Sequence, residues 1–174
     1  MSRSGTTDPL VAATGAAELV AALSAVSATV ATAESLTAGL LSATIAGVPG
    51  ASAVLRGGVV VYATDLKHSL AGVDAAVLVE SGPVAGPTAA QLATGARRTC
   101  GADWGVALTG VAGPAAQDGR PPGLVYLGVA GPDGVEVRQL ALSGDRWTIR
   151  LGAVTAAIAA LRDRVGNLPP GGMR

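Results

Sequence analysis

The feature that most constrains the fold of this chain is the stretch at residues 29–39, Thr-Val-Ala-Thr-Ala-Glu-Ser-Leu-Thr-Ala-Gly. It begins as a short apolar run with β-branched residues and ends in small hydroxylated ones, which is the pattern of a buried strand that leads through a polar turn into a helix. Ser35 and Thr37 lie in that turn. Backbone N–H groups at the first turn of a helix are unpaired and carry the positive end of its dipole. The turn is therefore either a helix cap or a place that holds an anionic ligand or a developing oxyanion.

The remainder of the chain alternates helical and strand patterns. Helices are predicted at residues 10–27, 37–46, 66–70 and 88–100, and from the Ser-Gly-Asp-Arg segment at 143–146 to residue 165. Strands are predicted at residues 29–33, 59–62, 104–109, 124–130 and 135–142. The β-branched run at 59–62 indicates an interior strand buried on both faces, and the Gly-Pro-Asp-Gly turn at 131–134 indicates an antiparallel hairpin. This order predicts an α/β fold, a three-layer α/β/α sandwich with a mixed sheet.

The chain of 174 residues is long enough for one domain with a core of its own. We expect that single domain at residues 10–165. The segments at 1–9 and 166–174 are rich in Gly, Pro and small polar residues and are predicted to be disordered. No window of about eighteen apolar residues is free of polar residues and Gly-Pro breaks, and the first residues lack a signal-peptide pattern. The sequence therefore predicts a soluble, cytoplasmic protein with no membrane partner.

The charge balance and the rare residues exclude several kinds of site. Twelve basic residues balance twelve acidic ones, so no net charge attracts a nucleic-acid backbone and no nucleic-acid partner is expected. Cys100 is the only cysteine and His68 the only histidine, which excludes an internal disulfide and a metal cluster built on Cys or His. A Ser-His-Asp triad would have to include His68, which is predicted on an exposed helix face. No metal and no cofactor are expected.

Lysine is the rarest basic residue in the sequence. Eleven of the twelve basic residues are Arg, and Lys67 is the only side-chain amine. Guanidinium groups stay protonated, whereas a desolvated ammonium can lose its proton near neutral pH. Lys67 is therefore either a single lysine kept by chance, with no special role, or a base that Arg cannot replace. Asp65 can cap the short helix at 66–70, which would place Lys67 in its first turn.

Three polar or Gly-rich loops follow predicted strands, at residues 34–39, 63–67 and 110–114. Ligands of open α/β sheets bind beyond the carboxyl ends of the strands. If the sheet brings these ends together, Ser35, Lys67 and Thr109 line one crevice. The Gly-Val-Ala-Gly-Pro loop at 110–114 lacks the spacing of a dinucleotide fingerprint, so its glycines alone do not identify a ligand.

Five short stretches resemble, in their order and spacing, the C-terminal domain of the competence/damage-inducible protein CinA. They are Thr-Ala-Glu-Ser at 32–35 with Thr37 and Gly39, Arg-Gly-Gly-Val-Val-Val-Tyr at 56–62 with Lys67, Thr-Gly-Val-Ala-Gly-Pro at 109–114, Pro-Gly-Leu-Val-Tyr at 122–126, and Gly-Asp-Arg at 144–146 with Arg150. The resemblance covers residues 19–164, nearly all of the predicted domain.

The resemblance implies a nicotinamide-nucleotide amidohydrolase, which converts nicotinamide mononucleotide and water to nicotinate mononucleotide and ammonia without a metal. By that resemblance Ser35 is the nucleophile and Lys67 its base, with Tyr62 assisting. The implied substrate-binding residues are Thr37, Gly39, Thr109, Gly110, Gly113 and Arg146, with Arg150 as a second phosphate ligand. The N–H groups of the turn at 37–39 are the expected oxyanion donors. The expected partners are a small-molecule nucleotide substrate and further copies of the same chain, as a homo-oligomer.

The sequence departs from the family pattern at three places. The replacements are Leu36 and Ala38 for a Cys and a Gly beside the nucleophile, Ala85 and Gly86 for a Ser-Glu pair, and Ala115, Ala116, Gln117 and Asp118 for a run of glycines. Ala38 adds a Cβ where backbone N–H groups are expected to approach the substrate. A second class of function therefore stays open, a nucleotide-binding or regulatory module that keeps the pocket without turnover.

Overall fold

The computed structural model describes residues 8–167, and its centre is one five-stranded sheet in the order β2-β1-β3-β4-β5. The strands are β1 (Val30–Glu34), β2 (Leu55–Val60), β3 (Trp104–Gly110), β4 (Leu124–Gly131) and β5 (Gly134–Ala141). β1 pairs in parallel with β2 and with β3, whereas β3, β4 and β5 pair antiparallel. The predicted mixed sheet and the predicted hairpin are both confirmed.

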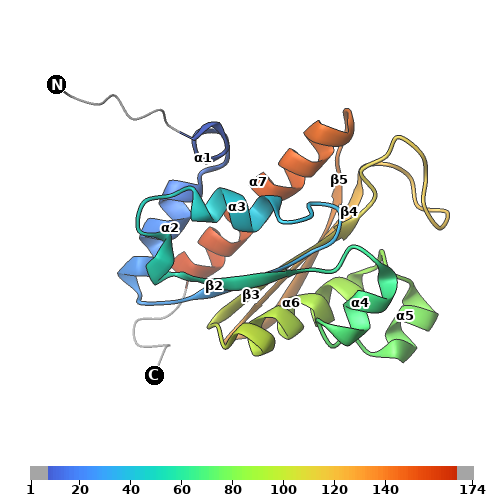
Figure 1. Cartoon of the computed structure of the whole chain (residues 1–174), viewed down its shortest axis with the longest axis horizontal. Helices are drawn as coiled ribbons and strands as arrows, with labels where there is room; N and C mark the ends of the chain where they lie inside the picture. The colour runs from blue at the N-terminus through green and yellow to red at the C-terminus, as the bar shows by residue number, and fades with distance from the viewer. Residues whose placement is uncertain (1–7, 168–174) are drawn as a thin grey trace.

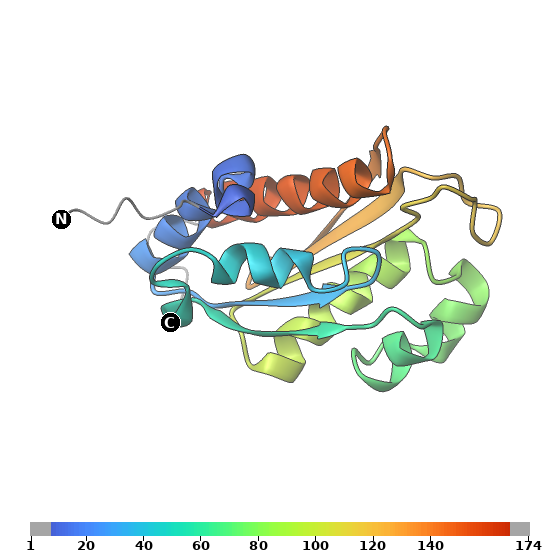
Figure 2. The ribbon, with the colours of Figure 1, turned by 45° about the horizontal axis from the view of Figure 1, so that its top comes forward.

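Helices cover both faces of this sheet (Figures 1 and 2). One face carries α1 (Pro9–Thr14), α2 (Ala16–Ala25), α3 (Leu40–Ala46) and α7 (Arg146–Gly166). The other carries α4 (Thr64–Ser69), α5 (Ala75–Ser81) and α6 (Gly86–Cys100). A short 3-10 turn, Ala51–Ala53, precedes β2. The three-layer α/β/α sandwich predicted from the order of the elements is therefore confirmed.

Small apolar side chains fill the space between the layers. The cluster under α2, α3 and α7 contains Trp104, the largest fully buried side chain, and the cluster under α6 consists mostly of alanine and valine. Two glycines let α6 approach its neighbours closely. A Cβ on Gly95 would lie 1.8 Å from the Ala71 carbonyl oxygen, and one on Gly105 would lie 2.0 Å from the Ala93 carbonyl oxygen. An interior that lacks Phe is thus filled by bringing backbones together.

Several predicted elements differ from the observed ones. The predicted helix at 10–27 is two helices, because Gly15 takes a left-handed φ of 73° between α1 and α2. The strand predicted as interior is the edge strand β2, whose residues alternate between half-buried and exposed. A run of apolar residues does not distinguish a strand buried on one face from one buried on both. Helix α5 was not predicted from the sequence, although the Asp74 side chain caps it.

The ends of the predicted domain are partly observed. Residues 1–7 and 168–174, most of the two segments predicted to be disordered, lie outside the described residues. At the inner edges of those segments, Asp8 accepts a hydrogen bond from the Leu10 N–H and caps α1, and Gly166 is the last residue of α7. None of the helices within residues 8–167 is both long and apolar enough to span a bilayer.

Candidate active site

The turn after β1 is held in place by a buried carboxylate. Glu34, the last residue of β1, accepts hydrogen bonds from the N–H groups of Gly39 and Leu41 at 3.0 Å and of Ser42 at 2.8 Å. Its side chain is fully buried. These donors belong to the first turn of α3 and the residue before it, where N–H groups otherwise lack partners. Glu34 thereby caps α3 from the strand side and fixes both ends of the turn that carries Ser35.

Lys67 lies directly beside Ser35. Its Nζ donates hydrogen bonds to Ser35 Oγ at 3.0 Å and to the Val61 carbonyl oxygen at 2.8 Å. The Lys67 side chain is only 2% exposed, and it has no carboxylate within ion-pair distance among the described residues. Burial without a counter-charge lowers the pKa of Lys67 from 10.5 to about 8. Near neutral pH a far larger fraction of this amine is therefore unprotonated than of an ordinary lysine, and that fraction is able to accept a proton from Ser35.

The sheet explains why two residues that are far apart in sequence meet here. Ser35 follows β1 and Lys67 lies in α4, which follows β2, and these two strands are parallel neighbours. Their carboxyl ends therefore lie side by side. Lys67 occupies the last turn of α4 and not its first turn, because α4 begins at Thr64 and Asp65 does not cap it. The neighbouring His68 is exposed and its Nδ1 lies 2.7 Å from the Val73 carbonyl oxygen, so it takes no part in a triad with Ser35.

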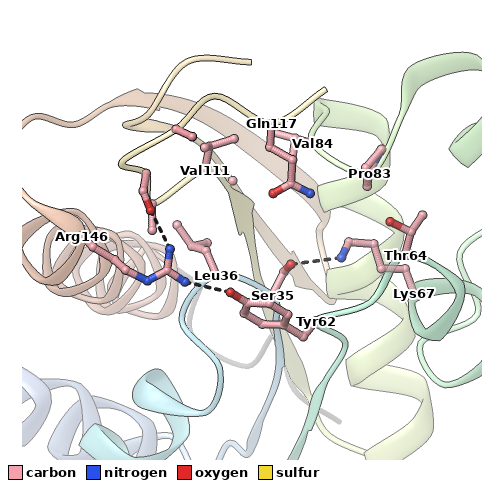
Figure 3. A pocket seen from close by; sticks show the side chains of 14 residues that line it. Ser35, Leu36, Tyr62, Thr64, Lys67, Pro83, Val84, Val111, Gln117 and Arg146 are labelled. Atoms are coloured by element: carbon pink, nitrogen blue, oxygen red, sulfur yellow. Dashed lines mark hydrogen bonds between the residues drawn. The ribbon is translucent and has the colours of Figure 1, made fainter. Parts of the chain in front are cut away.

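A pocket of about 90 Å³ opens over the Ser35–Lys67 pair (Figure 3). Its polar side chains come from four segments of the chain and are Ser35, Tyr62, Thr64, Lys67, Gln117 and Arg146. Gly110, the last residue of β3, and Gly113, in the loop that follows it, form part of its wall. Both glycines were predicted as binding residues, and both line the pocket.

Arg146, in the first turn of α7, crosses the mouth of this pocket. Its Nη1 donates to the Gly113 carbonyl oxygen at 2.7 Å, and its Nη2 donates to Tyr62 Oη at 2.8 Å. Asp145 caps α7, since its side chain accepts a hydrogen bond from the Thr148 N–H. Tyr62 is 56% exposed and hydrogen-bonded to Arg146, so the structure places it at the rim and not against Lys67. Arg146 is the cationic side chain that faces the pocket at a distance from the Ser–Lys pair.

Four residues predicted to bind substrate do not line the pocket. Thr109 is fully buried and donates to the Pro83 carbonyl oxygen at 2.7 Å, which corrects the expectation that it lines the crevice. Gly39 donates its N–H to Glu34. Thr37 is fully buried, and its Oγ1 has no hydrogen-bond partner among the described residues. Arg150 donates to the Leu36 and Thr37 carbonyl oxygens, so it binds the nucleophile turn and not the pocket. The partners of Thr109 and Arg150 could not be read from the sequence, because they lie 26 and more than 100 residues away along the chain.

The divergent positions divide into two groups. The Ala38 side chain is exposed, and the residue has a left-handed φ of 49° and does not line the pocket, so its Cβ does not obstruct the site. Gln117, in contrast, lines the pocket, and Figure 3 shows its amide directed into it. A tight turn at Asp118 and Gly119, both with positive φ, pairs the backbone of Gln117 with Arg120. In the sequence, Gln117 was distinguished only by lying where the family pattern has a run of glycines.

The described part of the chain offers no set of side chains that could coordinate a metal ion. Among residues 8–167, no three His, Cys, Asp or Glu side chains are grouped so that they could hold an ion. Glu34 is the acidic residue next to the pair, and its oxygens already accept hydrogen bonds from α3.

The fold and the site together define a mixed-sheet α/β domain with a buried Ser–Lys pair at the carboxyl ends of its parallel strands. The sequence model of the CinA C-terminal domain matches residues 12–165. The chain belongs to this family, which confirms the resemblance noted from the sequence.

Relatives and solved structures agree with this assignment. A CinA-like protein of Frankia casuarinae is 49% identical over 143 residues, which are 82% of this chain and 33% of the relative. A CinA-like protein of Anaeromyxobacter dehalogenans is 47% identical over 83% of this chain and 36% of the relative. The chain thus spans about a third of the curated relatives that it matches.

The fold is also found in crystal structures. The competence/damage inducible protein CihA of Agrobacterium tumefaciens has a TM-score of 0.84 and 31% identity, covering 96% of this chain and all of the other. A CinA superfamily protein of Klebsiella pneumoniae has a TM-score of 0.87 and 27% identity, covering 92% of this chain and all of the other.

Proposed function

We propose that this protein is a nicotinamide-nucleotide amidohydrolase that uses Ser35 and Lys67. The observation that carries the proposal is the 3.0 Å contact between Lys67 Nζ and Ser35 Oγ, made by a buried amine whose pKa is lowered to about 8. A nucleophilic hydroxyl within hydrogen-bond reach of a base of suitable pKa is the arrangement that acyl transfer requires. The resemblance to the CinA family supplies the substrate.

The reaction proceeds in two acyl-transfer steps. Unprotonated Lys67 takes the proton of Ser35 as Oγ attacks the carboxamide carbon, which forms the C–O bond and places negative charge on the carbonyl oxygen. The C–N bond then breaks, and the leaving nitrogen departs as ammonia with the proton from Lys67. Water next attacks the acyl-serine with Lys67 as base, releasing the carboxylic acid product, which ionises, and restoring Ser35. Every proton is thus transferred through one amine.

Arg146 gives the pocket its selectivity for a nucleotide over the free base. Its guanidinium is held at the rim by the Gly113 carbonyl and by Tyr62, and neither partner carries a negative charge. A phosphate that enters the pocket can therefore form charge-assisted hydrogen bonds with Arg146 without displacing a carboxylate. Tyr62 acts at this rim by orienting Arg146.

A second candidate function is a nucleotide-binding module without turnover. The observation that favours it is the side chain of Gln117, which occupies part of the pocket where the family pattern has glycine. If Gln117 blocks the approach of the carboxamide to Ser35, nucleotides bind at Arg146 and remain intact.

Ammonia release by the purified chain separates the two candidates. We expect wild type to release one ammonia per nicotinamide mononucleotide consumed, with no effect of a chelator. Ser35→Ala, Lys67→Arg and the double variant should each lose about 10³-fold or more in kcat, because partners in one mechanism are not additive. Ser52→Ala, at an exposed position outside the pocket, is the control. Binding of the nucleotide without ammonia release would establish the second candidate.

A further inference from the structure

Arg150 makes an unusual pair of contacts behind the nucleophile. It lies one turn after Arg146 in α7, is half-buried, and does not line the pocket. Its Nε donates to the Leu36 carbonyl oxygen at 3.0 Å and its Nη2 to the Thr37 carbonyl oxygen at 2.9 Å. No carboxylate lies within ion-pair distance of it among the described residues. One cation therefore holds the two carbonyls that directly follow Ser35 and draws them toward α7.

The peptide planes determine what these contacts do to the opposite side of the turn. In a trans peptide the C=O and the N–H point in opposite directions, and the peptide bonds of this turn are trans. The Leu36 carbonyl shares its peptide with the Thr37 N–H. The Thr37 carbonyl shares its peptide with the Ala38 N–H, which donates to the Ser35 carbonyl at 3.1 Å. That last carbonyl shares its peptide with the Leu36 N–H.

Arg150 is therefore linked to two N–H groups. One link passes through the Leu36 carbonyl to the Thr37 N–H of the same peptide. The other passes through the Thr37 carbonyl, the Ala38 N–H and the Ser35 carbonyl to the Leu36 N–H. Neither N–H has an acceptor within the part of the chain that the structure describes. The other N–H groups of the turn are used, since Ala38 donates to Ser35 and Gly39 donates to Glu34. This corrects the expectation that the N–H groups at 37–39 together hold an oxyanion, because only the first of them is available.

We propose that Arg150 is a positioning residue that orients and polarises the Leu36 and Thr37 N–H groups as donors to the oxyanion formed when Ser35 attacks. The inference rests on the proposed function, because it requires acyl transfer at Ser35. Arg150 draws the Leu36 and Thr37 carbonyls toward α7, so the Thr37 N–H, which shares its peptide with the Leu36 carbonyl, points away from α7. The Leu36 N–H, at the end of the second link, belongs to the residue that lines the pocket beside Ser35. Hydrogen bonds in series strengthen one another, so a guanidinium at the start of each link makes the terminal N–H a better donor.

The expected loss follows from what remains when Arg150 is removed. The two N–H groups are still present in Arg150→Ala, but their orientation is no longer fixed. Removing one oxyanion donor costs about 10²- to 10³-fold in kcat, and a misplacement of about 1 Å costs on the order of 10²-fold. We therefore expect Arg150→Ala to lower kcat about 10²-fold with little change in KM. Arg150→Lys, which can hold one carbonyl but not both in a fixed fork, should lose about tenfold.

The experiment compares Arg150→Ala, Arg150→Lys and the control Arg162→Ala in the full chain. Arg162 lies on the same helix with a side chain 44% exposed, and its nearest acidic group, Asp163, is 3.7 Å away. Two rates are measured for each protein. The first is ammonia release from nicotinamide mononucleotide, and the second is labelling of Ser35 by a fluorophosphonate, followed by intact mass. In that labelling the Ser35 Oγ–P bond forms, fluoride leaves, and Lys67 takes the hydroxyl proton.

The inference predicts parallel losses in both rates for Arg150→Ala, an unchanged pH profile, and partial recovery, at least about fivefold, when guanidinium ion is added at low concentration. The control should keep wild-type rates. The inference is overturned if Arg150→Ala raises KM for the nucleotide at unchanged kcat, which is the signature of a phosphate ligand. It is also overturned if activity falls only in proportion to the folded fraction, or if added guanidinium restores nothing.

Failure of the proposed function gives a different result. If wild type is labelled at Ser35 but releases no ammonia, the nucleotide substrate is wrong, while the labelling rates still test Arg150. If wild type neither releases ammonia nor reacts with the fluorophosphonate, Ser35 is not an activated nucleophile, and the proposed function and this inference are both overturned.

Discussion

Replacing Lys67 with Met tests the desolvated amine through both activity and stability. Lys67→Met keeps much of the side-chain volume and removes the titrating group. With a pKa of about 8 in place of 10.5, about one tenth of the wild-type amine is unprotonated at pH 7, against about one part in 3,000 for an ordinary lysine. Burial thus supplies about 300-fold more of the base. Wild-type kcat/KM should rise about tenfold per pH unit below pH 8 and level off above it, and Lys67→Met should lose this profile together with its activity.

The same pKa predicts how stability changes with pH. Between about pH 8 and 10.5 the unfolded chain binds a proton at Lys67 that the folded protein has released, so the free energy of unfolding of wild type rises with pH in this window. The lowered pKa corresponds to about 3 kcal/mol over the whole window. Lys67→Met lacks this contribution. Wild type should therefore gain up to about 3 kcal/mol relative to the variant, about 6–12 °C in Tm for a chain of this length.

Denaturant unfolding of both proteins at pH 7, 8, 9 and 10 measures this gain, because groups common to the two proteins cancel in the difference. Arg162→Ala serves as the control, and its difference from wild type should stay constant across the series. Parallel curves for wild type and Lys67→Met would mean that the amine is not desolvated in the folded protein, which would refute the basis for its role as a base.

Three further predictions concern the surroundings of the pair. Arg146→Ala should raise KM about 10- to 100-fold for the nucleotide and much less for the phosphate-free riboside, measured by steady-state kinetics; equal effects would place Arg146 away from the phosphate. Glu34→Gln leaves one side-chain oxygen as acceptor for the backbone N–H groups that now donate to two carboxylate oxygens. This change should lower the free energy of unfolding by about 1–3 kcal/mol, measured by denaturant titration. Ala38→Gly relieves a left-handed alanine and should raise Tm by a few degrees with unchanged kcat, since the side chain is exposed outside the pocket; a loss of activity would implicate its Cβ in the site.

The sequence was sufficient for the layers of the fold and for the central pair. Periodicity located most helices and strands, and Ser35 and Lys67 were identified because they follow strands and because Lys67 is the only amine. Their contact depends on β1 and β2 being neighbours, which the sequence suggested but could not establish. The wrong assignment of β2 as an interior strand has the same origin, since strand order is set by packing across the whole sheet.

The errors at the site arise from hydrogen-bond partners that the sequence did not reveal, most of them in distant segments. Thr109 belongs to a matching motif, but its hydroxyl is used by the Pro83 carbonyl, 26 residues away in sequence. Arg150 lies one turn from Arg146 and was expected to share its ligand, yet it sits about 6 Å further along α7 and contacts the turn after Ser35 instead. Gly39 was expected to meet substrate and instead meets Glu34. In each case the residue was correctly expected to donate a hydrogen bond, but its acceptor was determined by the fold.

The loop that carries Gln117 has a consequence for how relatives of this protein can diverge. Its two ends are tied together by hydrogen bonds from the Val111 N–H to the Leu124 carbonyl at 2.9 Å and from the Gly123 N–H to the Val111 carbonyl at 2.8 Å. Insertions or replacements between these ends therefore leave the register of β3 and β4 unchanged. Ser35 and Lys67 lie on the other, parallel half of the sheet. After a gene duplication, this part of the pocket wall, with Gln117, can therefore drift or be exchanged as a block while Ser35 and Lys67 keep their geometry.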